Sequence, residues 1–240
     1  MAFSAIVVAP IGGQADPFAY PITDEECNVI EEKLDHGLSN VVTATSIFFS
    51  YRGASSSKQV IQGLNLKVDF YVTDSRVVLL CEKYDKGSSW SGGLAALALD
   101  AASSIAAAAR RKGKVMLGHI RYEWISEITY NHKGHIGISY KDGDKNCWTL
   151  GLLFKKATDT EFVANEILRR TCAYRLAMTD QEEKERHEGA VEFFVKYSTG
   201  GRITPTENPK KESSRIQIPY SFLAPGGQKF RPGTQQQENE

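Results

Sequence analysis

Apolar and polar residues alternate along the middle of the chain with the two-residue period of a half-buried β-strand. One run places apolar side chains at every second position, at Leu64, Leu66, Val68, Phe70 and Val72. The next apolar run covers residues 77–81, and the polar residues 73–76 favour a turn because their short side chains can bond the backbone. The two runs therefore predict a β-hairpin.

Short runs rich in β-branched and aromatic residues predict five further strands. They cover residues 41–50, 114–120, 125–130, 136–140 and 147–154. Polar, glycine-containing segments at residues 131–134 and 142–143 predict the turns that join the last three of these strands. About seven strands are therefore expected between residues 41 and 154.

One amphipathic helix is expected directly after these strands. Thr158 and Glu161 have the spacing of a capping box, in which two side chains bond the free backbone groups of a helix start. Apolar or small residues then share one helical face, at Ala164, Ile167, Leu168, Thr171 and Cys172. Strands followed by a closing helix predict an α+β domain over residues 41–178, an antiparallel β-barrel or sandwich.

The N-terminal residues 1–40 are predicted to form an irregular leader and one helix. Thr23 and Glu26 repeat the capping spacing, and Cys27, Ile30 and Leu34 would share one face. Gly37 would end this helix, since glycine adopts the left-handed conformation without a steric penalty.

The C-terminal flank is predicted to contain a second amphipathic helix and then a disordered tail. Thr179 and Glu182 repeat the capping spacing, which predicts a charged helix over residues 179–198. Its apolar side carries Val191, Phe194 and Val195. From residue 199 onward, five prolines and a glutamine run leave little apolar surface, so residues 199–240 are expected to be disordered. The apolar island at residues 218–223 is interpreted as a linear docking motif.

The sequence YVTDSRVVLL at residues 71–80, together with the strand order, resembles the bacterial pleckstrin-homology-like domains and their GRAM relatives. A strand–TDxR–strand segment is common in that superfamily, and ISEIT at residues 125–129 resembles its short strand before the next hairpin. Members bind phosphoinositides, peptides or other protein domains, so the resemblance implies a binding role. Lipid-binding members gather basic residues around the first strand–strand loop, where this chain has Arg52 and Lys58.

An alanine-rich insertion at residues 87–113 departs from that superfamily. Its alanine content predicts a helix over residues 94–109, preceded by Trp90. Four cations follow it: Arg110, Arg111, Lys112 and Lys114. One interpretation is peripheral contact with anionic lipid through Trp90 and these cations. The other is packing against protein, with the cations offsetting the helix dipole.

Charge and composition exclude several classes of function. The chain has 29 Lys and Arg and 29 Asp and Glu, so its overall field does not attract nucleic acid or membranes, and no nucleic-acid partner is expected. Four widely spaced cysteines lack the close pairs of zinc or redox motifs. We interpret them as reduced core thiols, and we expect a soluble, cytoplasmic protein, peripheral to the inner face of the membrane in the lipid interpretation.

Catalytic candidates are few. His132 and His135 bracket a predicted turn, and with Glu123 they are the residues on which a metal enzyme or hydrolase would depend. Glu123 and Glu127 are otherwise expected to face water or to pair with Arg121. The glycine- and serine-rich residues 87–93 lack the lysine and spacing of a phosphate-binding P-loop, so no cofactor is expected.

The sequence thus predicts a non-catalytic interaction module of pleckstrin-homology-like fold. It would hold another protein, with a second copy of this chain as the first candidate, through a strand edge, the inserted helix or the helix after Thr179. The alternative is peripheral membrane recruitment through Trp90 and the basic cluster. A hydrolase or metal enzyme is a second alternative.

Overall fold

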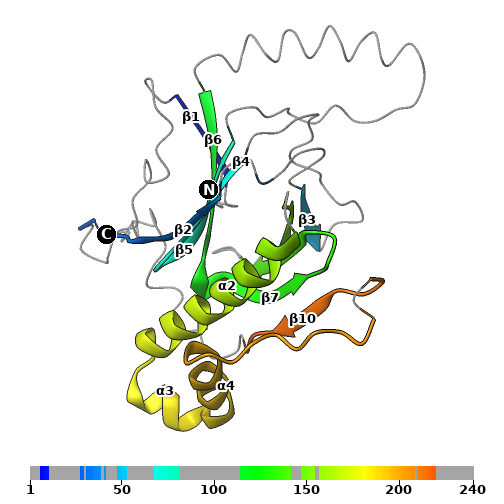
Figure 1. The fold of residues 1–240 in the computed structure, drawn as a ribbon. Coiled ribbons are helices and arrows are strands. Elements are labelled where there is room, and N and C mark those ends of the chain that lie inside the picture. Colours follow the sequence, from blue (N-terminus) through cyan, green and yellow to red (C-terminus); the bar gives the residue numbers. More distant parts are fainter. Residues whose placement is uncertain are drawn as a thin grey trace, which may run out of the picture.

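The computed structural model of this chain describes residues 6–10, 28–29, 31–38, 41, 48–52, 68–81, 114–141, 147–154, 157–208 and 210–219. These residues form an α+β fold of two antiparallel sheets, with the C-terminal helices packed against them (Figure 1).

The first sheet is a three-stranded meander with one added strand on each side. Three consecutive strands form the meander: β4 (Val68–Thr73), β5 (Arg76–Cys81) and β6 (Lys114–Arg121). On its outer edges, β1 (Ile6–Pro10) pairs with β6 and β2 (Leu34–Leu38) pairs with β4. The edge strands come from a part of the sequence remote from the meander.

The second sheet is built in the same way. Its meander consists of β7 (Ile125–Tyr130), β8 (His135–Lys141) and β9 (Cys147–Leu153). On the outer edges, β3 (Phe48–Arg52) pairs with β9 and β10 (Ser214–Gln217) pairs with β7. A short 3₁₀ turn, η1 (Tyr122–Trp124), connects β6 to β7 and so joins the two sheets.

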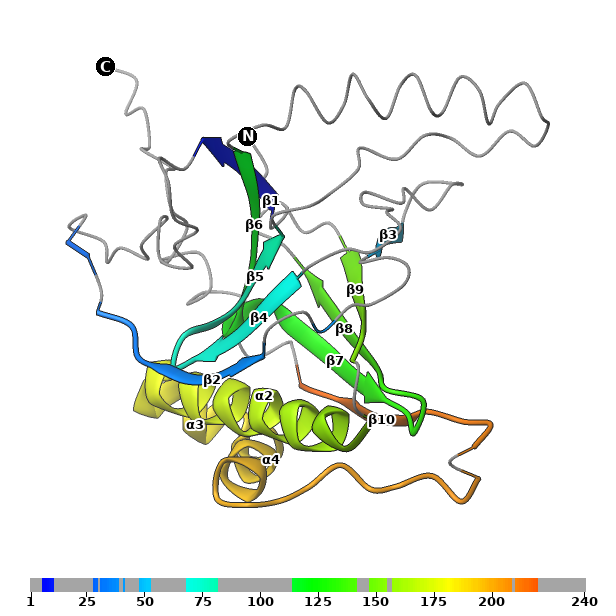
Figure 2. The ribbon, with the colours of Figure 1, turned by 45° about the horizontal axis from the view of Figure 1, so that its top comes forward.

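The core lies between the two sheets and the long helix α2 (Ala157–Met178), which crosses beneath both of them in Figure 2. The predicted apolar face of α2 is fully buried, as are alternate residues of the strands. Phe70 of β4 and Phe154 after β9 meet edge to face across the sheets, with ring centroids 5.6 Å apart. Each fully buried apolar side chain of this kind contributes about 1.5–3 kcal/mol.

The predicted turns at residues 73–76 and 131–134 are confirmed. In the second, the Asn131 side chain accepts hydrogen bonds from the backbone of Lys133 and His135 at 3.0 and 3.2 Å. Gly134 has a φ of +88°, and a Cβ atom there would lie 2.7 Å from the carbonyl oxygen of Phe154. Only glycine therefore fits this turn without a shift of the backbone.

The predicted helix over residues 179–198 is two helices, α3 (Gln181–Arg186) and α4 (Glu188–Ser198), separated at His187. The N-cap of α3 is Asp180, whose carboxylate accepts from the Glu183 N–H at 2.8 Å, and not Thr179 as the capping pattern predicts. Thr179 instead donates to the carbonyl of Arg175. Along α4, Phe194 is buried and Val195 is exposed.

Two predictions about the flanks are wrong. The predicted N-terminal helix is absent from its described part, because residues 34–38 pair with the edge of β4 as strand β2. The tail expected to be disordered from residue 199 contributes β10, because Ser214 to Gln217 find backbone partners on β7. In both flanks a distant sheet edge overrides the local pattern.

Other expectations are confirmed in part. The described strands form two separate sheets and no closed barrel, so of the two predicted forms the layered one describes them better. Residues 48–50 of the predicted strand 41–50 lie in β3, and residues 68–72 of the predicted strand 64–72 lie in β4. Residues 42–47 and 64–67 lie outside the described residues. The turn at residues 142–143 and the insertion at residues 87–113 lie outside the described residues.

Candidate functional site

The structure places two of the seven residues predicted to bind a ligand. Arg52 lies at the end of β3 in the second sheet, and Lys114 lies at the start of β6 in the first sheet. The other five lie outside the described residues: Lys58, Trp90, Arg110, Arg111 and Lys112. Arg52 belongs to the predicted loop site and Lys114 to the predicted basic cluster, and the other members of both lie outside the described residues, so both sites stay predictions.

The residues considered for a metal centre are also separated. His132 and His135 are exposed in the turn between β7 and β8, whereas Glu123 is buried in η1 at the other end of β7. Among the described residues, no three metal-ligating side chains gather in one place. Glu123 pairs with Arg121, one of the two arrangements expected for it.

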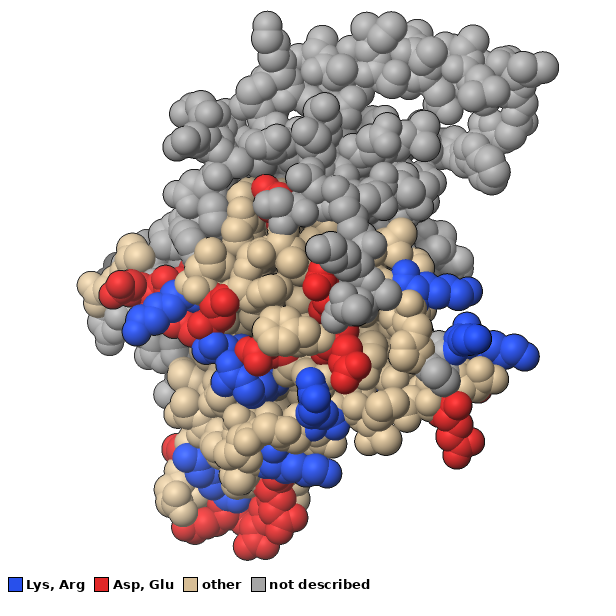
Figure 3. All heavy atoms as spheres, in the orientation of Figure 1, with Lys and Arg blue, Asp and Glu red and all other residues tan. Residues whose placement is uncertain are grey.

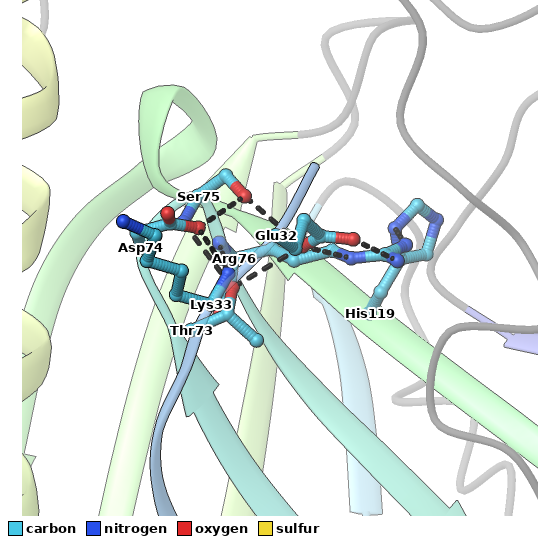
Figure 4. Close-up of polar contacts among 7 residues, drawn as sticks. All are labelled: Glu32, Lys33, Thr73, Asp74, Ser75, Arg76 and His119. Atoms are coloured by element: carbon cyan, nitrogen blue, oxygen red, sulfur yellow. Dashed lines mark hydrogen bonds and ion pairs between the residues drawn. The ribbon is translucent and has the colours of Figure 1, made fainter. Parts of the chain in front are cut away.

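A buried ion pair anchors the segment before β2 to the hairpin turn between β4 and β5 (Figure 4). Arg76 Nε donates to Glu32 Oε1 at 2.9 Å, and Arg76 Nη2 donates to Glu32 Oε2 at 2.5 Å. The two side chains are only 1% and 3% exposed. This two-point geometry is the strongest arrangement of an arginine with a carboxylate.

The turn surrounds this pair with further polar groups. Ser75 Oγ donates to Glu32 Oε1 at 3.0 Å. Thr73 Oγ1 lies 3.2 Å from the same oxygen and 2.9 Å from the Arg76 carbonyl, so its single proton serves one of the two. The Asp74 N–H donates to the Lys33 carbonyl, and the Lys33 N–H donates to the Asp74 carboxylate. The turn thus holds the incoming segment at several points.

His119 of β6 completes this cluster. Arg76 Nη1 lies 3.3 Å from His119 Nδ1, and an arginine can only donate, so Nδ1 accepts. Burial, together with the nearby guanidinium groups of Arg76 and Arg121, lowers the pKa of His119 to about 3. The imidazole is therefore neutral at physiological pH and serves as a hydrogen-bond acceptor.

A second buried ion pair lies beside the first. Arg121 is the cross-strand partner of Arg76, and its guanidinium contacts the carboxylate of Glu123. Burial raises the pKa of Glu123 above its ordinary value, against the attraction of Arg121. Burial also raises the pKa of Tyr174, which bonds Arg121 from α2, to about 12. Each arginine of the cross-strand pair thus has its own carboxylate.

Arg175 of α2 joins the corner between the sheets to the C-terminal tail. Its guanidinium is fully buried and donates to the backbone carbonyls of Glu123 at 3.2 Å and of Ile125. Those two bonds come from Nη2, and Nη1 of the same guanidinium donates to the carbonyl of Pro219 at 2.6 Å. The guanidinium also lies 5.8 Å from the ring centroid of Phe194 on α4. The Arg175 side chain therefore connects α2 with the corner between the sheets, the C-terminal tail and α4.

The tail segment packs into a seat formed by the edge of β7 and by Arg175. Ser214 is buried, accepts from the Thr206 N–H at 3.2 Å and bonds the hydroxyl of Tyr130. Ile218 is 3% exposed, and its N–H donates to the Ser126 carbonyl at 2.8 Å. Ile218 therefore packs inside its own molecule, which corrects the interpretation of residues 218–223 as a docking motif at Ile218; residues 220–223 lie outside the described residues.

The buried polar side chains hold segments of the chain together, since none of them is open enough to meet a dissolved substrate. On the visible described surface, acidic and basic side chains are interspersed (Figure 3). Arg186 with Glu182 and Arg169 with Glu166 are examples of such surface pairs. Cys172 is a buried free thiol, as expected, and burial raises its pKa to about 12. Within the described residues, no helix has the length and hydropathy to span a membrane.

Sequence reasoning missed Glu32, Arg76 and Arg175, although two of them leave a signal. Arg175 continues the buried stripe of α2, three residues after Cys172, where a solvated helix face would not be expected. Arg76 lies between a turn and a continuous apolar strand. A charge at a position whose neighbours are all buried indicates a buried partner. The partner itself cannot be read from the sequence, because Glu32 is 44 residues away from Arg76.

Comparisons of this chain with protein-family models, with curated proteins and with solved structures find no match.

Proposed function

We propose that this protein is a non-catalytic interaction module of pleckstrin-homology-like fold that holds a protein partner by adding an extended segment to a sheet edge. Seven strands, β3 to β9, followed by α2 are consistent with the resemblance found in the sequence. The observation that carries the proposal is that segments from outside the two meanders already extend both sheets, as β1, β2 and β10. Such edges supply affinity through main-chain hydrogen bonds.

The outer edge of β2 supports this proposal best. No described strand pairs with that edge, and β2 ends the first sheet. Leu34 of β2 and Phe162 of α2 are 49% and 48% exposed, although both are large and apolar. The ring centroids of Phe162 and His36 lie 5.0 Å apart, and Arg170 pairs with Asp35 at 2.7 Å. Helix α2 and strand β2 therefore form one surface.

This surface fits an extended protein segment better than a lipid or a small ligand. A strand edge presents regularly spaced donors and acceptors, which another backbone matches and a lipid does not. The flanking charges Asp35, Glu166 and Arg170 are of both signs and already paired, so they give no net attraction to an anionic headgroup. The partner is therefore an extended segment with apolar side chains on alternate positions.

The proposal can be tested by selecting extended peptides from a display library on the full chain. A selected peptide should slow amide hydrogen exchange along β2 and bind at least tenfold more weakly to the Leu34→Lys variant. Val195→Lys is the matched control, because Val195 is 44% exposed on α4. Equal loss of binding in both variants, or failure to select any peptide, would contradict the proposal.

Vesicle sedimentation distinguishes the proposed peptide binding from the alternative of membrane recruitment. The full chain should stay in the supernatant with vesicles that contain phosphatidylserine. Recovery in the pellet that is lost when Arg110, Arg111, Lys112 and Lys114 are all changed to Ala would instead favour recruitment through the basic cluster. Bound zinc or another metal in the purified protein would favour the metal-enzyme alternative.

A further inference from the structure

The seat between β7 and α2 has the features of a recognition site for an extended peptide. One wall is the edge of β7, which bonds the backbone of the tail over four residues. At the far end, Arg175 binds the carbonyl of Pro219. Main-chain pairing along a strand edge with a charged donor at one end is a mode by which proteins bind peptides.

The occupant of this seat shows which chemistry it accepts. Ser214 is buried and bonds Tyr130, so a small hydroxyl residue fits the first position. Ile216 is partly buried and Ile218 is fully buried, whereas Arg215 and Gln217 between them are exposed. The seat therefore accepts a hydroxyl residue followed by apolar residues at the second and fourth positions after it. The proline that follows has no N–H to satisfy.

The connection to the tail allows the segment to leave the seat. The chain after α4 is fixed to α2 as far as Ile203, which is buried and bonds the side chain of Asn165 at 2.9 Å. From residue 204 to residue 213, every residue with a described side chain is exposed except Thr206, which is intermediate. Detaching residues 214–219 thus disturbs few other contacts, and the β7 meander keeps its own pairing to β8.

We propose that the seat between β7 and α2 binds an extended segment of another protein, and that residues 214–219 are its built-in competitor. A short tether, here the mostly exposed residues 204–213, gives its segment an effective concentration on the order of 1 mM. A second copy of this chain at micromolar concentration offers the same contacts without that advantage and does not displace the segment. The partner is therefore a tighter-binding peptide of the same pattern, and the tail sets the affinity that it must exceed.

The test uses the full chain and a labelled synthetic peptide with the sequence of residues 211–220. Ile218→Asp places a charge in the buried position of the built-in segment while the seat keeps its wild-type residues. The peptide, measured by fluorescence anisotropy, should bind the Ile218→Asp protein at least tenfold more tightly than the wild type. Ser213→Asp adds the same charge at an exposed position just before β10 and should behave as the wild type.

Further measurements keep the outcome decisive. If Ile218→Asp loses the cooperative thermal transition, the milder Ile218→Ala replaces it, with an expected gain of severalfold. Peptide bound to either variant should slow amide exchange in β7, and a peptide with Asp at both isoleucine positions should not bind. Equal affinity of variant and wild type would overturn the proposal, and so would a stable wild-type dimer at micromolar concentration that exchanges β10.

Failure here is distinguishable from failure of the proposed function. The seat lies on the second sheet, whereas the Leu34→Lys experiment reports on the edge of β2 in the first sheet. Suppose that Leu34→Lys weakens the binding of a selected peptide, while Ile218→Asp does not change the affinity for the tail peptide. The proposed function would then stand, and only the inference about the seat would be wrong.

Discussion

Strands β2 and β10 both come from the flanks of the chain and extend the edge of a sheet, yet they are held by different chemistry. The segment before β2 carries a buried charge, Glu32, which meets Arg76 at two points. The β10 segment buries no charge of its own: Ile218 is buried, a neutral carbonyl accepts from Arg175, and Arg215, which pairs with Glu127 at 3.5 Å, is 65% exposed.

These two anchors determine which strand can leave its sheet. Removal of the β2 segment would leave Arg76 buried beside Arg121, two cations on opposed strand positions with one carboxylate. An uncompensated buried charge is costly, so this strand is part of the permanent fold. Removal of β10 takes a neutral carbonyl from Arg175 and breaks the partly exposed Arg215–Glu127 pair, but it leaves no buried carboxylate or arginine without its ionic partner. Water can replace the lost backbone hydrogen bonds at small cost. An anchor without a buried ion pair therefore suits a segment that leaves and returns.

The largest effect is expected for Arg76→Met. The change leaves Glu32 buried without a cation and should lower the free energy of unfolding by about 3–5 kcal/mol. Urea denaturation measures it, and adding Glu32→Leu to the same protein should recover much of the loss. Arg186→Ala removes an exposed ion pair and should cost less than about 1 kcal/mol. A loss for Arg76→Met no larger than that control would remove the distinction between the two anchors.

Arg175→Met should have the second-largest effect. Neutral carbonyls lose a charged donor, and each such bond contributes about 1.5–3 kcal/mol. Part of the loss should be local, because one of the carbonyls belongs to the tail. Trypsin should then cleave after Arg215 faster than in the wild type, and much faster than in Arg76→Met at matched overall stability. Equal cleavage of the two variants would show that Arg175 has no special connection to β10.

Acid should weaken the β2 anchor through His119. The folded protein leaves this imidazole neutral down to its pKa of about 3, whereas the unfolded chain binds a proton near its ordinary pKa of about 6.5. The unfolded state therefore binds more protons between these values, and stability falls as the pH drops, by at most about 1.4 kcal/mol per pH unit. His119→Gln keeps an acceptor for Arg76 and should reduce this acid dependence between pH 6.5 and pH 4.5. An unchanged dependence would place the acid sensitivity elsewhere.

Ser214→Ala should have the smallest effect, because it weakens only the contacts of β10. The loss of one buried hydroxyl should cost about 1 kcal/mol, confined to β10. The amide of Ile218 should then exchange about fivefold faster, while amides in β8 keep their wild-type rates. A uniform increase over both strands would show that β10 opens only with the whole fold.

The meanders and α2 could be predicted because the residues that determine them are close together in the sequence. Strand alternation and the stripe of α2 repeat over many residues, and neighbouring strands pair through short turns. β2 was mistaken for a helix because Cys27, Ile30 and Leu34 also fit a helical face, and the strand exists only through β4. β10 was missed because four residues in a polar tail carry little weight, although Ser214, Ile216 and Ile218 alternate as a strand does.

The candidate site was less predictable than the fold for the same reason. The residues singled out from the sequence were six cations and one tryptophan near a predicted loop and a predicted inserted helix. Those that hold the flanking strands are buried ions whose partners are distant in the sequence. Arg76 and Glu32 are separated by 44 residues, and Arg175 and Pro219 by 44 as well. An unusual charge shows that a partner exists, and only the tertiary structure identifies it.

The antiparallel register of β10 on β7 has a mechanical consequence. Gln217 ends β10 and Pro219 follows two residues later, so a pull on the chain beyond Pro219, directed away from the sheet, reaches the Arg175 contact first. The backbone hydrogen bonds between β10 and β7 then break one after another, and no step requires several of them to break together. Tension applied at this terminus would peel the strand at low force while the rest of the molecule stays intact.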